Sequence, residues 1–382
     1  MKTIQNLLLI TLFIITCSCR AEVSKEIAIS NTVNLENSSK HFIKVALLLD
    51  TSNSMDGLID QAKAQLWEIV NELSYAKCRN ERPNLQIGLY EYGNDNLKSS
   101  EGYIRKILAF TNDLDDVSKE LFSLTTNGGS EYCGTVIKSS LEKLDWGNDD
   151  DDLKMIFIAG NEPFTQGKIN YKDAAAIAKE KNVVVNTIFC GDYEHGISAQ
   201  WQDGALLTYG DYIAINHNQE TVHITSPYDD IIIQLNIRLN NTYIPYGNIG
   251  RKKIAIQEEQ DNNAAGYSKA NAVSRTVTKG SHLYKNSSWD LVDAEEEDDF
   301  RYDELKTDEL PKVLQGKSKA QIKSYVAEQR VLRKQIQKEI QGQNEKRRQY
   351  ISKNKAEAEN GLESVMIKAI KKQAEKKNYT WN

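Results

Sequence analysis

Between residues 41 and 246, short apolar segments alternate with amphipathic helical patterns, and this alternation constrains the fold more than any other feature. The short segments are rich in β-branched and aromatic residues, as strands are. Continuous apolar strands separated by helices predict a doubly wound, mostly parallel α/β sheet with helices on both faces. The strand-like segments are residues 41–49, 85–92, 103–110, 153–159, 183–190 and 211–215, and the helical patterns are residues 58–76, 115–124, 135–144, 171–181 and 229–240.

One pair of strand-like segments has no helical pattern between its members. Residues 85–92 and 103–110 are separated only by a polar stretch. A short connection joins antiparallel neighbours, whereas parallel neighbours need a longer crossover. We therefore expect one antiparallel edge strand on an otherwise parallel sheet.

The C-terminal part of the chain has a different composition. Residues 247–300 are polar and show no period, which predicts a linker or long loop. Residues 301–382 are charged and rich in strong helix formers, so we expect an α-helical C-terminal extension, an αα-hairpin or short coiled coil. Its narrow apolar stripes need a partner surface, and Tyr379 and Trp381 are expected to pack back on the α/β domain. The stripes are Leu332, Ile336 and Ile340, then Leu362, Val365, Met366, Ala369 and Ile370.

The N-terminus has the three parts of a bacterial export signal. Lys2 precedes an apolar core, residues 7–15, that is too short to span a bilayer, and small residues follow. Residues 1–19 are thus a predicted signal peptide and residues 20–40 an N-terminal linker. Cys17 and Cys19 are similar to a lipobox, with ordinary cleavage near Ala21 as the alternative. We expect an exported protein of the periplasm or cell surface, membrane-anchored by lipid on Cys19 or Cys17.

The overall charge argues against one class of partner. A formal net charge of −6 does not favour nucleic acid, which we do not expect this chain to bind. Lys and Arg are concentrated in the C-terminal region, although the whole chain is acidic. That excess forms either a solvated helix face or a surface for anionic lipid or an acidic partner.

Three cysteines remain in the predicted mature chain: Cys78, Cys133 and Cys190. Three thiols cannot all pair within one molecule. Two outcomes stay open, namely three buried thiols, or one disulfide with one buried thiol.

Oxygen-bearing side chains follow the first strand directly. Asp50, Ser52 and Ser54 come after the apolar segment and before a helical pattern. Ligands of doubly wound sheets lie beyond the carboxyl ends of the strands. A carboxylate with two hydroxyls suits a hard divalent cation, Mg²⁺ first, with Ca²⁺ or Mn²⁺ as alternatives. Capping of the next helix is the simpler explanation, but one such residue would suffice for a cap.

The motif Asp50-Thr51-Ser52-Asn53-Ser54, with the strand order around it, resembles the von Willebrand factor A domain family. The resemblance implies a metal-ion-dependent adhesion site, in which Asp50, Ser52 and Ser54 hold the cation. The loop at residues 127–134 is similar to the family's second loop, with Ser130 in the place of a Thr ligand. The family further implies that a carboxylate of a bound protein completes the metal site.

The third loop departs from the family pattern. In the segment that precedes Pro163, Gly160 stands where the family has an Asp. Asn161 or Glu162 are the possible substitutes, through a shifted loop or a water. Together with the export signal, the resemblance implies a metal-dependent, non-catalytic protein-binding module of the bacterial envelope. We expect no catalytic residues.

Two other functions compete with this hypothesis. One is a hydrolase that uses Cys133 with a downstream histidine, although no spacing indicates it. Glu91 and Glu131 near strand ends offer a carboxylate pair of unknown separation. The other is a metal-free structural or assembly protein that acts through its C-terminal helices.

Overall fold

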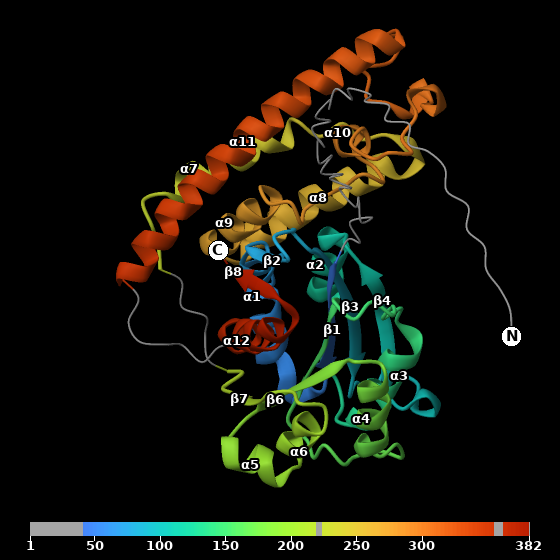
Figure 1. Ribbon diagram of the computed structural model, residues 1–382, viewed down its shortest axis with the longest axis vertical. Helices are drawn as coiled ribbons and strands as arrows, with labels where there is room; N and C mark the ends of the chain where they lie inside the picture. Colours follow the sequence, from blue (N-terminus) through green and yellow to red (C-terminus); the bar gives the residue numbers. More distant parts are fainter. Residues whose placement is uncertain (1–40, 219–223, 355–361, 382) are drawn as a thin grey trace, which may run out of the picture. The chain divides into compact units, whose positions relative to one another are not determined.

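The computed structural model describes residues 41–218, 224–354 and 362–381, and Figure 1 shows their arrangement. The described residues fall in one compact unit. The predicted signal peptide and linker, with Cys17 and Cys19, lie outside the described residues. In the part of the chain that is described, no helix is both long enough and apolar enough to cross a bilayer.

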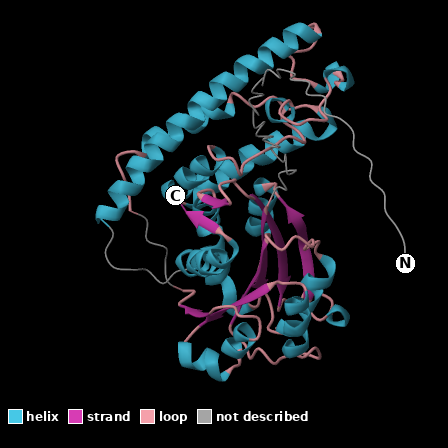
Figure 2. Ribbon diagram, viewed as in Figure 1, coloured by secondary structure: helices cyan, strands magenta, loops and turns pink. Residues whose placement is uncertain are grey.

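The centre of the unit is a sheet of six strands in the order β4-β3-β1-β5-β6-β7. All neighbours are parallel except β3 and β4, which are antiparallel. The prediction of a mostly parallel sheet with one antiparallel edge strand is confirmed (Figure 2). The strands are β1 (Phe42–Asp50), β3 (Asn84–Tyr92), β4 (Ile104–Thr111), β5 (Leu153–Gly160), β6 (Val184–Cys190) and β7 (Tyr212–Ile215).

Helices cover both faces of this sheet. Side chains of β1 alternate between two apolar cores, because successive residues of a strand point to opposite faces. Leu47 and Leu49 lie in the core under α1, whereas Ala46 and Leu48 lie in the core under α3 and α4. The helices of this region are α1 (Asp56–Leu73), α2 (Leu114–Ser123), α3 (Cys133–Lys143), α4 (Tyr171–Glu180), α5 (Tyr193–Ser198), α6 (Trp201–Leu206) and α7 (Asp229–Asn240).

The predicted linker at residues 247–300 is helical instead. The prediction is wrong because the charged groups that this segment buries pair with one another and with the α/β region. Helix α9 packs on α1 and α7, and α8 packs on α2 and α9. The helices are α8 (Gly247–Tyr267), α9 (Lys269–Lys279) and α10 (Leu291–Ala294).

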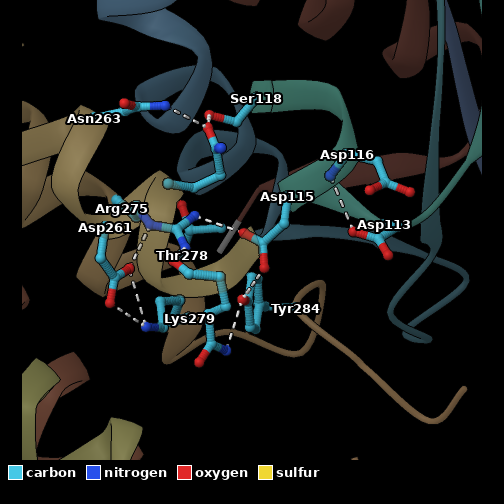
Figure 3. Close-up of polar contacts among 12 residues, drawn as sticks. Asp113, Asp115, Asp116, Ser118, Asp261, Asn263, Arg275, Thr278, Lys279 and Tyr284 are labelled. Atoms are coloured by element: carbon cyan, nitrogen blue, oxygen red, sulfur yellow. Dashed lines mark hydrogen bonds and ion pairs between the residues drawn. The ribbon is translucent and has the colours of Figure 1, made fainter. Parts of the chain in front are cut away.

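A buried ionic network connects these helices to α2, as Figure 3 shows. Arg275 donates to Asp115 over 2.7 Å and to Asp261 over 2.6 Å, and its side chain is 1% exposed. Lys279 pairs with Asp261 at 2.9 Å, and Tyr284 donates to Asp115 at 2.6 Å. Burial lowers the pKa of Lys279 to about 8. Since each charge has a partner, the polar segment can be buried without leaving an isolated ion.

The C-terminal extension is helical, as predicted, but its helices do not pair as an αα-hairpin. Helix α11 packs on α7, α9 and α10, whereas α12 packs on α1 (Figure 1). Ile336 and Ile340 of the first stripe are fully buried, while Leu332 is 38% exposed. The elements are α11 (Lys319–Asn354), α12 (Leu362–Ala374), β2 (Ala76–Cys78) and β8 (Tyr379–Trp381). Short 3₁₀ segments occupy Asn53–Met55, Ser99–Glu101, Tyr302–Glu304, Thr307–Glu309 and Glu375–Lys377.

The chain's last described residues return to the α/β region, as predicted for Tyr379 and Trp381. Strand β8 pairs antiparallel with β2, which places Tyr379 opposite Cys78. The indole of Trp381 donates to the carbonyl of Glu72 at 3.1 Å. Cys78, Cys133 and Cys190 are buried free thiols, so the first of the two cysteine outcomes is confirmed.

Candidate metal centre

Asp50 is the last residue of β1, at the carboxyl end of a central strand. Its side chain is fully buried. The backbone N–H of Ser52 donates to Oδ1 of Asp50 at 2.7 Å, which turns the chain sharply after the strand. The next residue, Thr51, is fixed to the neighbouring strand through a 2.8 Å hydrogen bond from its N–H to the carbonyl of Tyr92. The carboxylate is therefore held rigidly at the rim of the sheet.

The two serines of the first loop lie together. Oγ of Ser52 is 3.3 Å from Oγ of Ser54, and Ser52 is buried while Ser54 is exposed. Neither serine caps a helix through its side chain: Ser52 precedes the first 3₁₀ segment without a side-chain capping bond, and Met55 occupies the N-cap of α1. The capping explanation for Asp50, Ser52 and Ser54 thus does not account for the cluster.

The second loop lies against the first. Asn53 donates its N–H to the carbonyl of Gly128 at 3.1 Å, and Asn127 donates to the carbonyl of Thr51 at 2.9 Å. An isolated antiparallel bridge joins Ser130 to Gly93, directly after β3. The fold therefore brings Ser130 to the same end of the sheet as the first loop.

Glu131 adds a second carboxyl group beside Asp50. Its side chain is 1% exposed. A Cβ atom on Gly93, whose φ is 82°, would lie 2.5 Å from Oδ1 of Asp50 and 2.9 Å from Cγ of Glu131. Both acids therefore converge on the bare backbone of Gly93, a position that only glycine fills without strain.

The electrostatics of this pair are unfavourable without a cation. Burial raises the pKa of Asp50 well above its ordinary value, and the neighbouring charge of Glu131 raises it further. Burial also raises the pKa of Glu131. Oδ2 of Asp50 is buried and has no hydrogen-bond partner among the described residues. Two buried acids with an unpartnered oxygen fit a bound divalent cation, which would neutralise them and satisfy that oxygen.

The third loop offers no acid at the position where the family has one. A Cβ atom on Gly160 would lie 2.5 Å from Oη of Tyr92 and 3.1 Å from Oδ2 of Asp50. Asn161 reaches the site instead, since its Nδ2 donates to Oγ of Ser54 at 3.1 Å. Glu162 reaches it only through its backbone N–H, which donates to Glu131 at 3.2 Å.

Glu131 is the site residue whose role sequence reasoning missed. The sequence suggests Glu131 only as a partner of Glu91, but the carboxylate of Glu91 accepts from Thr51 at 3.4 Å and pairs with Arg105 at 2.5 Å. The signal in the sequence is its place directly after Ser130, a proposed ligand on the same loop. What the sequence does not carry is the burial that directs this side chain to Asp50.

The cysteine of the hydrolase hypothesis lies behind the site. Cys133 begins α3, is fully buried, and its Sγ is 3.9 Å from Oη of Tyr92. Burial raises the pKa of its thiol well above the ordinary value, and the charge of Glu131 adds to this. Because the thiolate is the nucleophile, this environment disfavours nucleophilic chemistry at Cys133. His195, in contrast, is exposed on α5.

Comparison with known proteins gives one family. Residues 44–196 match the model of the von Willebrand factor type A domain. No curated protein matches the chain.

Several solved structures are similar over less than half of the chain. BatB from Bacteroides thetaiotaomicron is 17% identical, with a TM-score of 0.35 over 45% of this chain and 90% of that one. An aerotolerance-related membrane protein from Bacteroides fragilis is 18% identical, with a TM-score of 0.32 over 46% and 93%. Proximal thread matrix protein 1 from the mussel byssus, with a zinc-occupied MIDAS motif, is 13% identical, with a TM-score of 0.35 over 47% and 42%.

Proposed function

Because residues 44–196 form a von Willebrand factor type A domain, we propose that the Asp50 site binds a divalent cation and, through it, a protein ligand. The observation that carries this proposal is the buried, unpartnered Oδ2 of Asp50 beside the buried carboxyl group of Glu131. A cation there would turn an unfavourable acid pair into an attachment point for a carboxylate of the partner.

Each residue has a part in this proposal. Asp50, Ser52, Ser54 and Ser130 are the ligands, and Glu131 supplies the second negative charge. The bound cation supplies an electrophilic position for a partner oxygen. Asn161 orients Ser54 through the 3.1 Å hydrogen bond between their side chains.

The donor set favours a hard ion. The side chains that converge on the site offer carboxylate and hydroxyl oxygens, which Mg²⁺, Ca²⁺ and Mn²⁺ prefer over nitrogen or sulfur. Two buried acids from two adjacent loops are most compatible with Mg²⁺, which keeps several waters in its shell. A carboxylate of the partner would take a position that the residues of this chain leave open on such an ion.

Thermal unfolding of the full-length chain tests metal binding. Melting is measured in EDTA and in a series of Mg²⁺, Mn²⁺ and Ca²⁺ concentrations. An ion at about 100 times its Kd stabilises the folded state by about 2.7 kcal/mol. Asp50→Asn should abolish this shift. Asp60→Asn is the matched control, because Asp60 is an exposed acid within α1.

A melting temperature that no ion raises, in a chain that folds normally, contradicts the proposal. The function would then lie with the C-terminal helices, as in a metal-free assembly protein. Partner binding is tested by crosslinking and affinity capture with wild-type and Asp50→Asn chains, with Mg²⁺ or EDTA. A protein retained only by the wild-type chain in Mg²⁺ supports the proposed attachment point.

The proposal includes the absence of catalysis. It is supported by the buried thiol of Cys133, whose raised pKa disfavours the thiolate. A broad hydrolase screen with wild-type and Cys133→Ala chains tests it. Turnover that Cys133→Ala removes would contradict it.

The proposed location is the bacterial envelope, with the chain exported and lipid-anchored. The support is the signal-like sequence that precedes Cys17 and Cys19. The full-length chain is expressed in bacteria, and mass spectrometry of its mature N-terminus should find a lipid-modified Cys19 or Cys17. An unmodified N-terminus near Ala21 would exclude the lipid anchor but leave export intact.

A further inference from the structure

We propose that His41, Asp149 and Asp151 form a second metal site, selective for a transition ion such as Zn²⁺. One ring nitrogen of His41 and one carboxylate oxygen of each Asp lie within 4.8 Å of one another. The cluster is at the amino end of β1, whereas Asp50 is at its carboxyl end. Nine residue steps at about 3.3 Å each separate the two sites by about 30 Å.

His41 is the observation that distinguishes this cluster from an ordinary acidic loop. Its side chain is 7% exposed, and its Nδ1 is buried without a hydrogen-bond partner among the described residues. Leaving a buried polar atom unpartnered costs about 1–3 kcal/mol. A metal ion bound through Nδ1 would remove that cost.

The backbone on both sides of His41 is fixed. Its carbonyl accepts from the N–H of Asn84 at 2.8 Å, which starts the β1–β3 pairing. The N–H of Phe42 donates to Oδ1 of Asp152 at 2.8 Å. The imidazole is therefore presented to the loop at residues 147–152 by the register of the sheet.

That loop is also preorganised. Oδ1 of Asp149 accepts from the N–H of Asp151 at 2.9 Å, which sets both side chains on one turn. The ammonium of Lys154 donates to the carbonyl of Gly147 at 2.9 Å, and that of Lys377 donates to the carbonyl of Asp152 at 2.8 Å. These lysines hold the loop through its backbone and leave the two carboxylates facing His41.

One competitor for the metal is present. Arg79 contacts both carboxylate oxygens of Asp151, at 2.9 and 3.0 Å, but the Arg79 side chain is 57% exposed. Ion pairs with an exposed partner contribute only about 0–1 kcal/mol, so a divalent ion can displace or share this contact.

The ligand types indicate which metals bind. An imidazole nitrogen with two carboxylates suits Zn²⁺, with water completing the shell, whereas Mg²⁺ and Ca²⁺ prefer oxygen donors alone. The two sites of the chain thus differ in ion preference. Because the Asp50 site has only oxygen donors, Zn²⁺ uptake at the second site is separable from Mg²⁺ uptake at the first.

A metal here would connect both ends of the described chain. The hydroxyl of Tyr379, in β8, lies 3.3 Å from the carbonyl of Phe42 and 3.2 Å from that of Asp151. The ion would connect the start of β1 to the loop at residues 147–152, which contacts β8 through Tyr379. We therefore assign it a structural role, in which Zn²⁺ strengthens the attachment of the C-terminal strand.

Metal titration of the full-length chain tests this site. The probes are Zn²⁺, followed by melting temperature, and Co²⁺, followed by its visible absorption. The Asp50→Asn background removes the first site. In that background we expect one ion per chain and a rise in melting temperature. His41→Gln should lower the affinity for Zn²⁺ at least about tenfold, so that both signals disappear at the same metal concentration.

Asp149→Asn is the second variant, because its amide oxygen can still accept from the N–H of Asp151 and preserve the turn. His195→Gln is the matched control, since it removes an exposed histidine on α5. The proposal predicts loss of Co²⁺ absorption with Asp149→Asn and no change with His195→Gln. Unchanged Co²⁺ uptake by His41→Gln or by Asp149→Asn would overturn it, whether or not the first site binds Mg²⁺.

Discussion

Oη of Tyr92 lies where a side chain on Gly160 would begin, only 2.5 Å from the Cβ atom that residue 160 would carry. The same hydroxyl donates to the carbonyl of Ala159 at 2.9 Å. This close contact leaves no room for a side chain at position 160, where an acidic ligand would stand. The second buried carboxyl group beside Asp50 comes from Glu131 instead. The second negative charge of the site therefore lies on the second loop rather than the third.

Gly160→Asp should therefore destabilise the chain rather than restore a ligand. Overpacking a dense core costs about 1–3 kcal/mol. Tyr92→Phe removes the hydroxyl that lies closest to the new side chain, so the double variant should recover part of the lost stability. As a single change, Tyr92→Phe costs one hydrogen bond, worth about 1 kcal/mol. Urea denaturation of both single variants and the double variant measures the coupling. Strictly additive effects would contradict the contact.

Glu131→Gln should change stability in opposite directions with and without metal. In EDTA, removing the charge beside buried Asp50 raises the free energy of unfolding, because the like-charge repulsion disappears. In Mg²⁺, the same variant should lose most of the metal-dependent stabilisation. Urea denaturation in the two buffers gives both values, and Glu101→Gln, on an exposed 3₁₀ turn, is the control. A variant that is less stable in EDTA would exclude the repulsion.

The metal-free chain should lose stability as pH rises from acidic to neutral at this site. The pKa values of Asp50 and Glu131 are raised in the folded state. The two protonated acids contribute fully to the free energy of unfolding below the ordinary carboxyl pKa, and this contribution is lost as pH rises through the raised pKa values. Metal-dependent stabilisation should grow over the same interval, because protons no longer compete. Melting curves across pH, with EDTA or Mg²⁺, measure both trends against an Asp50→Asn, Glu131→Gln double variant, which should lack them.

Arg275→Ala should be among the most destabilising single changes. It leaves Asp115 and Asp261 as buried acids without their principal partner, which costs about 3–5 kcal/mol. Arg238→Ala is the matched control, because the Arg238 side chain is 49% exposed and its pair with Glu339 is worth about 0–1 kcal/mol. Chemical denaturation compares the two. Similar losses would mean that the buried network does not attach α8 and α9 to α2.

The sequence determined the α/β region with little ambiguity. The apolar runs and helical patterns are local signals, and each side-chain period is fixed by backbone geometry alone. The end of β1 at Asp50 followed from the same pattern, and the rule for carboxyl ends of parallel strands placed Ser52 and Ser54 in a rim loop. The antiparallel edge strand followed from a missing helix, which is also a local observation.

Tertiary structure alone decided which polar residues are buried. The segment after residue 246 is polar, yet the side chains of Arg275 and Lys279 are buried because they form ion pairs with Asp115 and Asp261. Glu131 likewise becomes a site residue only through its burial against Asp50. Hydrophobic periodicity reports which apolar side chains face a core, whereas a charged side chain is buried only if a partner distant in sequence neutralises it. That partnership exists in three dimensions and leaves no periodic signal in the chain.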